Sequence, residues 1–138
     1  MIAYLDTSVL LRLVLREPGA FEELTSCAGL VASELLAVES LRTLDRLRLQ
    51  GALSTEEAAF RRAEVMVWLE AVDLVLLRPP ILARASDPYP APLGTVDALH
   101  LATALVWRER MRQPLVMATH DHGLAVGARA YGMEVVGA

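Results

Sequence analysis

The stretch Ile2-Ala3-Tyr4-Leu5-Asp6-Thr7-Ser8 runs from a short apolar segment straight into a polar triplet. Its apolar part predicts a strand, and a helix-like pattern follows it. Three more acids, Glu39, Asp97 and Asp121, stand at comparable places, near the start of a helix-like segment or at the end of an apolar run. The open edge of a parallel α/β sheet collects its chemistry at such places. Four carboxylates brought to one edge would form a site for hard divalent cations.

Short apolar runs alternate with longer helical patterns along the whole chain, which predicts an α/β fold with a parallel sheet covered on both faces. We expect one domain over residues 1–138, because this length suffices for one core and is too short for two comfortable ones. Strands are expected at residues 2–5, 29–32, 73–77, 115–118 and 133–136. Helices are expected at residues 8–16, 20–27, 33–50, 54–71, 80–86, 95–110 and 122–130, with a proline-rich loop at 87–94.

Composition excludes several classes of protein. Apolar residues make up 54% of the chain and charged residues 22%, which is typical of a globular protein. The single cysteine, Cys27, excludes an internal disulfide framework and a Cys-rich zinc site. Neither a signal peptide nor an apolar run of bilayer length is apparent, so we expect a soluble, cytoplasmic protein with no membrane contact.

The chain contains no lysine, since all 13 basic residues are arginine. A Schiff-base lysine and a P-loop lysine are therefore excluded, and no glycine-rich nucleotide-binding motif is present. The net charge is −4, so any contact with nucleic acid would have to be local.

The first two acids each allow a structural interpretation beside the functional one. Asp6 could cap the helix that follows it, although Ser8 could do so equally well and leave Asp6 free. Glu39 lies off the apolar stripe of its helix and could pair with Arg42 on the surface. Glu34 competes with it, but five residues apart the two acids point roughly 140° away from each other.

Asp97 and Asp121 also allow both a structural and a functional interpretation. Asp97 falls in the first turn of an apolar helix that Thr95 could cap, and a carboxylate in such surroundings is costly without a partner or a metal. His100 is one turn further on, so it could face the same way as Asp97 and orient a neighbour. Asp121 could cap the next helix, and the flanking His120-x-His122 is a weak zinc signal without further ligands.

These motifs together resemble those of the PIN-domain ribonucleases, and most closely the VapC-type toxins of type II toxin–antitoxin modules. The opening strand with Asp6-Thr7-Ser8 is similar to the first motif of that family. The stretch from Val31 to Arg42 is similar to the second motif and selects Glu39 over Glu34. The stretch from Thr95 to Ala104 is close to the third motif, and Ala118-Thr119-His120-Asp121 resembles the fourth. His120 and the proline-rich loop are departures from the family pattern, but neither removes an acid.

The resemblance implies a three-layer α/β/α sandwich with about five parallel strands. It also implies RNA cleavage dependent on Mg²⁺ (or Mn²⁺), a homodimer and inhibition by a cognate antitoxin protein. Asp6, Glu39, Asp97 and Asp121 would be the catalytic and metal-binding acids. We expect Thr7, Ser8 and Thr119 to orient the carboxylates, with Arg42, Arg46, Arg12 and Arg16 as candidate RNA contacts.

Two rival functions belong to other classes. The chain could be a catalytically inactive binding module that acts through protein contacts, with Phe21, Phe60 and Trp68 on candidate dimer or antitoxin surfaces. It could also be a phosphatase with Asp6 as nucleophile. The haloacid-dehalogenase type wants a second Asp two residues after the first and a downstream lysine, whereas this chain has Ser8 and no lysine.

Overall fold

The computed structural model describes residues 1–138 and contains one five-stranded sheet of order β3-β2-β1-β4-β5. Every neighbouring pair of strands is parallel. The predicted parallel α/β sheet is therefore confirmed, with β1 at its centre. The strands are β1 Ile2–Leu5, β2 Gly29–Ser33, β3 Asp73–Val75, β4 Val116–Ala118 and β5 Glu134–Val136.

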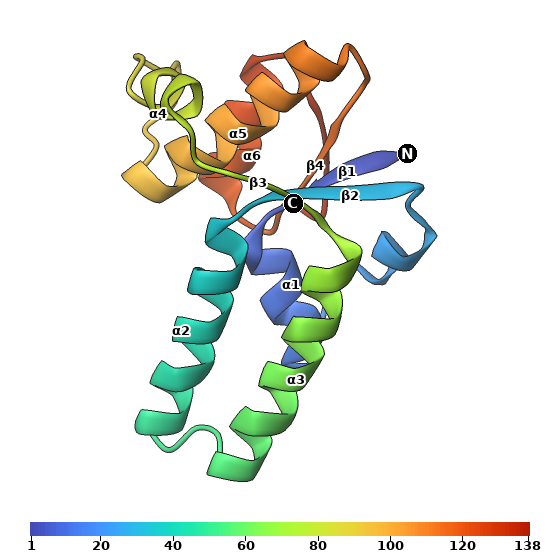
Figure 1. The fold of residues 1–138 in the computed structure, drawn as a ribbon, viewed down its shortest axis with the longest axis vertical. Coiled ribbons are helices and arrows are strands. Elements are labelled where there is room, and N and C mark those ends of the chain that lie inside the picture. Colours follow the sequence, from blue (N-terminus) through green and yellow to red (C-terminus); the bar gives the residue numbers. More distant parts are fainter.

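The helices form a layer on each face of this sheet (Figure 1). One layer comprises α1 Thr7–Val14, α2 Leu35–Leu49 and α3 Thr55–Ala71. The short 3₁₀ helix η1 Glu22–Ser26, between α1 and β2, lies on the same side. The other comprises α5 Thr95–Met111 and α6 His122–Ala130, with α4 Pro79–Ala85 packed against α5. The predicted three-layer α/β/α arrangement is confirmed.

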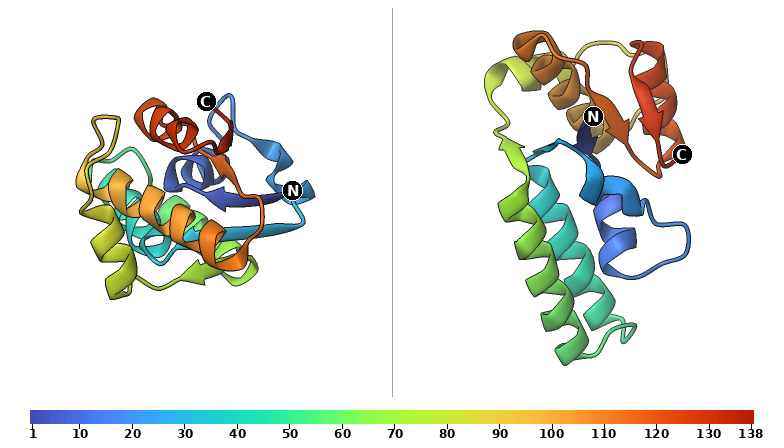
Figure 2. Two further views of the ribbon diagram at one scale, coloured as in Figure 1. Left: turned by 90° about the horizontal axis from the view of Figure 1, so that it is seen from above. Right: turned by 90° about the vertical axis from the view of Figure 1, so that its right-hand side faces the viewer.

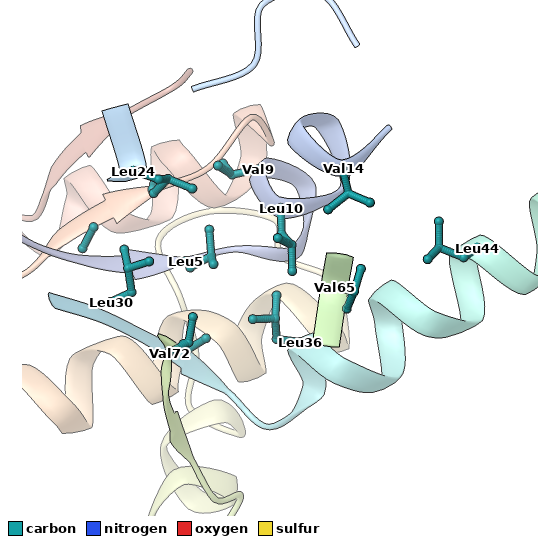
Figure 3. Close-up of a cluster of buried hydrophobic side chains, with 13 residues drawn as sticks. Leu5, Val9, Leu10, Val14, Leu24, Leu30, Leu36, Leu44, Val65 and Val72 are labelled. Atoms are coloured by element: carbon teal, nitrogen blue, oxygen red, sulfur yellow. The ribbon is translucent and has the colours of Figure 1, made fainter. Parts of the chain in front are cut away.

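Alternating side chains of the strands supply a core on each side of the sheet, as the period of two requires. Ala3 and Leu5 of β1 point to the side of α1, α2 and α3, where Figure 3 shows Leu5 close to Leu10 and Leu36. Tyr4 points to the opposite side, where it packs with Leu101 of α5. Tyr4 therefore brings a hydroxyl group into the core on this side of the sheet.

Helices α2 and α3 form an antiparallel pair that extends well beyond the sheet (Figures 1 and 2). Gly51 follows the C-cap of α2 and has a φ of 78°, which glycine adopts more easily than other residues, so it stops the helix. The expected N-cap of α3 is present, since the backbone N–H of Glu57 donates to Oγ of Ser54. Phe60 is exposed on this pair, whereas Phe21 and Trp68 are only partly exposed and pack against the core.

Several boundaries differ from the sequence predictions. Residues 20–27 contain a 3₁₀ helix and not an α-helix, and β3 ends at Val75. Gly94 occupies the N-cap position of α5, so Thr95 is its first helical residue and not its cap. No helix combines the length and the apolar composition needed to cross a membrane.

Candidate active site

The carboxyl ends of the central strands bring the first and fourth sequence motifs together. Leu5 of β1 is paired with Ala118 of β4, and the N–H of Asp6 donates to the carbonyl of Ala118 at 3.0 Å. On the other side of β4, the N–H of Thr119 donates to the carbonyl of Val136 at 3.1 Å. Parallel pairing therefore places Asp6 and Thr119 next to each other at one edge of the sheet.

Asp6 is 5% exposed, and one of its two carboxylate oxygens is held by hydroxyl groups. Ser8 and Thr119 both donate to Oδ2, at 2.6 and 2.8 Å. Oδ1 accepts no hydrogen bond from the protein, and the carboxylate does not cap α1. Ser8 does not cap the helix either, because it lies within α1 and accepts a hydrogen bond from the N–H of His120. The capping interpretation of Asp6 is therefore excluded.

Glu39 of α2 has the same asymmetry. Thr7 donates to Oε1 at 3.0 Å, and Nε2 of His100 lies 2.5 Å from the same oxygen. Oε2 has no hydrogen-bond partner in the protein. Arg42 pairs with Asp45 at 3.0 Å, so the alternative of a Glu39–Arg42 surface pair is excluded. Glu34 takes part in none of these contacts and occupies the N-cap position of α2.

Asp97 projects from the first turn of α5 and is half-buried without any hydrogen-bond partner in the protein. Burial raises the pKa of this carboxyl group, and the negative charges of Asp121, Asp6 and Glu39 raise it further, partly offset by His100. A carboxylate that is desolvated and surrounded by like charges favours its protonated form unless a cation is present. Asp97 therefore feels the negative charges of the other three acids and makes no ion pair or hydrogen bond within the protein.

Asp121 does cap a helix. Its Oδ1 accepts a hydrogen bond from the N–H of Leu124 at 2.7 Å, and its own N–H donates to Oγ1 of Thr119 at 2.9 Å. Oδ2 makes no hydrogen bond with the protein. The N-capping interpretation is correct for Asp121, and it still leaves one carboxylate oxygen available.

His100 is 1% exposed and lies behind the acids of β1 and α2. Its Nε2 is 3.8 Å from Oδ1 of Asp6 as well as 2.5 Å from Glu39, and its Nδ1 is 2.8 Å from the hydroxyl of Tyr4. Its hydrogen bonds therefore go to Glu39 and Tyr4, so His100 is a hydrogen-bonded core histidine, as expected, and the neighbour that it contacts is Glu39. Sequence reasoning missed Tyr4 altogether, although a lone hydroxyl in an apolar strand one residue before Leu5-Asp6 was a usable signal.

The flanking histidines do not assemble a zinc site. Nδ1 of His120 donates to the carbonyl of Gly137 at 2.6 Å, whereas His122 is exposed and makes no hydrogen bond. A zinc site needs three or four converging ligands, and no such group of His, Cys, Asp and Glu side chains exists in the structure.

A magnesium or manganese site at the four acids also requires that several ligands converge. As the side chains stand, they form no tight cluster of three or more ligands. The donor set nevertheless fits: Asp6, Glu39 and Asp121 each keep one oxygen free of protein hydrogen bonds, and Asp97 keeps both. Mg²⁺ binds through a few carboxylate oxygens and retains several waters, so it does not require a closed protein cage.

The candidate RNA-contacting arginines all have partners within the protein. Arg12 lies 3.8 Å from Glu17, and Arg16 is 3.1 Å from Glu64 of α3. Arg42 pairs with Asp45, and Arg46 donates to Thr43 at 3.4 Å. Such exposed pairs are weak, so a phosphate could compete for these side chains, and their role in RNA binding stays a prediction.

Comparison with known proteins identifies the family of the chain. Residues 3–127 match the PIN domain family. The chain is 32% identical over 136 residues to Ribonuclease VapC47 of Mycobacterium tuberculosis, an alignment that covers 94% of this chain and 91% of that protein. It is also 32% identical over 137 residues to Ribonuclease VapC46 of the same species, with 96% and 95% covered.

Solved structures share the fold at lower identity. A toxin–antitoxin complex from Klebsiella pneumoniae matches with a TM-score of 0.67 at 18% identity, covering 99% of this chain and 96% of that one. VapBC2 from Rickettsia felis, bound to a DNA fragment from its promoter, matches with a TM-score of 0.65 at 10% identity, covering 98% and 97%. The chain belongs to the PIN domain family, and the relatives it matches along nearly its whole length are VapC ribonucleases.

Proposed function

We propose that this protein is an endoribonuclease that hydrolyses phosphodiester bonds of single-stranded or looped RNA with the help of Mg²⁺ or Mn²⁺. The observation that carries the proposal is the group of acids at the carboxyl edge of the sheet, with oxygens that no protein donor occupies. The ribonuclease names of its full-length relatives support the choice of RNA as substrate.

Each acid has a distinct part in this proposal. Asp6, Glu39 and Asp97 would hold the cation directly or through water, and Asp121 would add negative charge from the N-terminus of α6. A bound Mg²⁺ or Mn²⁺ would supply Lewis-acid chemistry, by making water more acidic and by neutralising charge on the phosphate oxygens. Thr7, Ser8 and Thr119 orient the carboxylates of Glu39 and Asp6 through the hydrogen bonds described above, which is a common way to tune ligands.

The partners we infer are a cognate antitoxin and a second copy of the chain, so that the protein would act as the toxin of a toxin–antitoxin pair. The toxin–antitoxin complexes among the structural neighbours support an antitoxin partner. Exposed apolar side chains on α3, among them Phe60, Met66 and Val67, offer surface for such contacts. Light scattering of the purified chain, alone and after co-expression with the protein encoded beside it, tests both assemblies.

The decisive experiment is RNA cleavage by wild-type protein and Asp6→Asn, each with Mn²⁺ and with EDTA. Asp6→Asn keeps the size of the side chain and removes one negative charge from the buried edge. We expect cleavage by the wild type with Mn²⁺ only, and a loss of at least about 100-fold in the variant, because loss of a residue that merely orients a metal ligand already costs about 10–100-fold.

Asp73→Asn is the matched control, because Asp73 is exposed at the opposite, amino-terminal edge of the sheet. It makes the same change of charge and should cleave like the wild type. Absence of cleavage with every metal, by protein shown to be folded and free of antitoxin, would instead favour an inactive protein-binding module.

A further inference from the structure

Behind Glu39 lie two buried polar side chains that the proposed chemistry does not use. Tyr4 of β1 is 0% exposed and His100 of α5 is 1% exposed. They are joined to each other by a hydrogen bond of 2.8 Å between the tyrosine hydroxyl and Nδ1. Buried polar groups in an apolar core are costly unless all of their hydrogen bonds are made, so such a pair requires an explanation.

The donors and acceptors fix the two ends of this chain of hydrogen bonds. The backbone N–H of Ser33 can only donate, and it donates to the hydroxyl oxygen of Tyr4 at 3.2 Å. When the ring of His100 is neutral, the hydroxyl of Tyr4 donates to Nδ1 and the ring proton is on Nε2; when the ring is protonated, Nδ1 donates to the hydroxyl oxygen and Nε2 still carries a proton. That N–H points at Oε1 of Glu39, 2.5 Å away, and an ionised carboxylate can only accept.

The far end of this chain selects one oxygen of Glu39. His100 and Thr7 both donate to Oε1, and neither reaches Oε2. Thr7, at the start of α1, and His100 of α5 occupy the same oxygen from two elements. They therefore hold the carboxylate of Glu39 in one orientation, although α2 projects from the sheet. Oε2 is the oxygen that remains for a cation.

We propose that Tyr4 and His100 are positioning residues: a buried relay from the backbone of Ser33 through both side chains holds Oε1 of Glu39 and so presents Oε2 to the metal. This inference depends on the proposed function for its metal, but its geometry does not depend on the substrate. The relay joins β2, β1, α5 and α2, and therefore ties the second acid to the strand that carries the first.

Two amide variants of His100 test the relay, because they have the same chemistry and differ in reach. The amide nitrogen of Gln can take the place of Nε2, whereas the shorter Asn reaches only the place of Nδ1. We expect His100→Gln to bind Mn²⁺ within a few-fold of the wild type and His100→Asn to bind it about 10–100-fold more weakly, the usual effect of losing a group that orients a ligand. Titration calorimetry without RNA measures both.

Kinetics and NMR give two readouts that simple loss of stability would not produce. In His100→Asn we expect kcat for RNA to fall with little change in KM, at a temperature where all variants are folded. In the wild type, nitrogen-15 NMR at a pH that neutralises the ring should show the proton of His100 on Nε2. In Tyr4→Phe the proton should stay on Nε2, because Glu39 still accepts it, but Mn²⁺ should bind more weakly because the ring has lost its contact at Nδ1.

Ser40→Ala is the control, because Ser40 is buried next to Glu39 in sequence and its hydroxyl has no hydrogen-bond partner. It should leave Mn²⁺ affinity unchanged. Equal Mn²⁺ affinity of the Asn variant and the wild type, or a wild-type proton on Nδ1, would overturn the relay. Wild-type protein that binds Mn²⁺ but cuts no RNA would refute only the proposed ribonuclease activity. The relay would still stand if the Gln and Asn variants differed in Mn²⁺ affinity.

Discussion

At the scale of single residues, three hydroxyl groups determine which carboxylate oxygens are available. Ser8 and Thr119 hold Oδ2 of Asp6, and Thr7 holds Oε1 of Glu39. Hydrogen bonds to an ionised acceptor are shorter and stronger than neutral ones, so each carboxylate has a fixed side and a free side. Asp97 has no such donor, and its environment works against its negative charge.

Asp97→Asn should therefore stabilise the metal-free protein at neutral pH. Because the pKa of Asp97 is raised on folding, its ionisation opposes the folded state. The contribution of Asp97 to stability is fully present below its unfolded pKa and is lost as pH rises through the folded pKa. We expect a higher Tm than wild type at neutral pH in EDTA, and a gain that disappears at acid pH, by scanning calorimetry.

Excess Mn²⁺ should reverse this order. A ligand that binds only the folded state stabilises it by about 2.7 kcal/mol at 100 times its Kd, and the wild type alone would retain the acid that helps to hold it. If Asp97→Asn melted below the wild type in EDTA at neutral pH, Asp97 would be paired with a group that the structure does not contain.

At the scale of elements, the sequence predicted the helices well because their signals are local. The serine at position 54 and the glycine at position 51 are read directly as a cap and a stop, and both were found. The first helix ends at Val14, two residues early, and Arg16 follows with a φ of 56° before Pro18. The cap of α5 was missed because Gly94 and Thr95 are both acceptable N-cap residues, and only the conformation of the loop before them selects one.

Ser54→Ala tests the local signal at the tip of the α2–α3 pair. Loss of the hydrogen bond to the N–H of Glu57 should cost about 1 kcal/mol of unfolding free energy, measured by urea denaturation. Thr55→Ala, at an exposed neighbour without a hydrogen bond, should change it by less than about 0.5 kcal/mol. RNA cleavage should be unaffected in both, because the cap lies at the end of the pair remote from Glu39, and a loss of activity in Ser54→Ala alone would contradict this.

At the scale of the whole molecule, the placement of the acids at one edge of the sheet was predictable, but the hydrogen bonds that each acid makes were not. The general rule for parallel sheets indicated that acids after strands would meet at one edge, and the sequence motifs selected Glu39 over Glu34. Which oxygen each acid presents depends on strand order. Only because β1 lies between β2 and β4 do Thr119 and Ser33 reach Asp6 and Tyr4, and no local pattern encodes pairings between residues 113 and 29 positions apart.

The central place of β1 also has a consequence for hydrogen exchange. Its amides are bonded to strands on both sides, whereas β3 and β5 lie at the edges of the sheet. Amides of β1 and the N–H of Asp6 should exchange with deuterium only when the whole chain unfolds, and those of β3 and β5 should exchange through smaller openings. Measured residue by residue, the slowest-exchanging backbone should lead directly into Asp6, so the first acid should keep its place through every smaller opening of the chain.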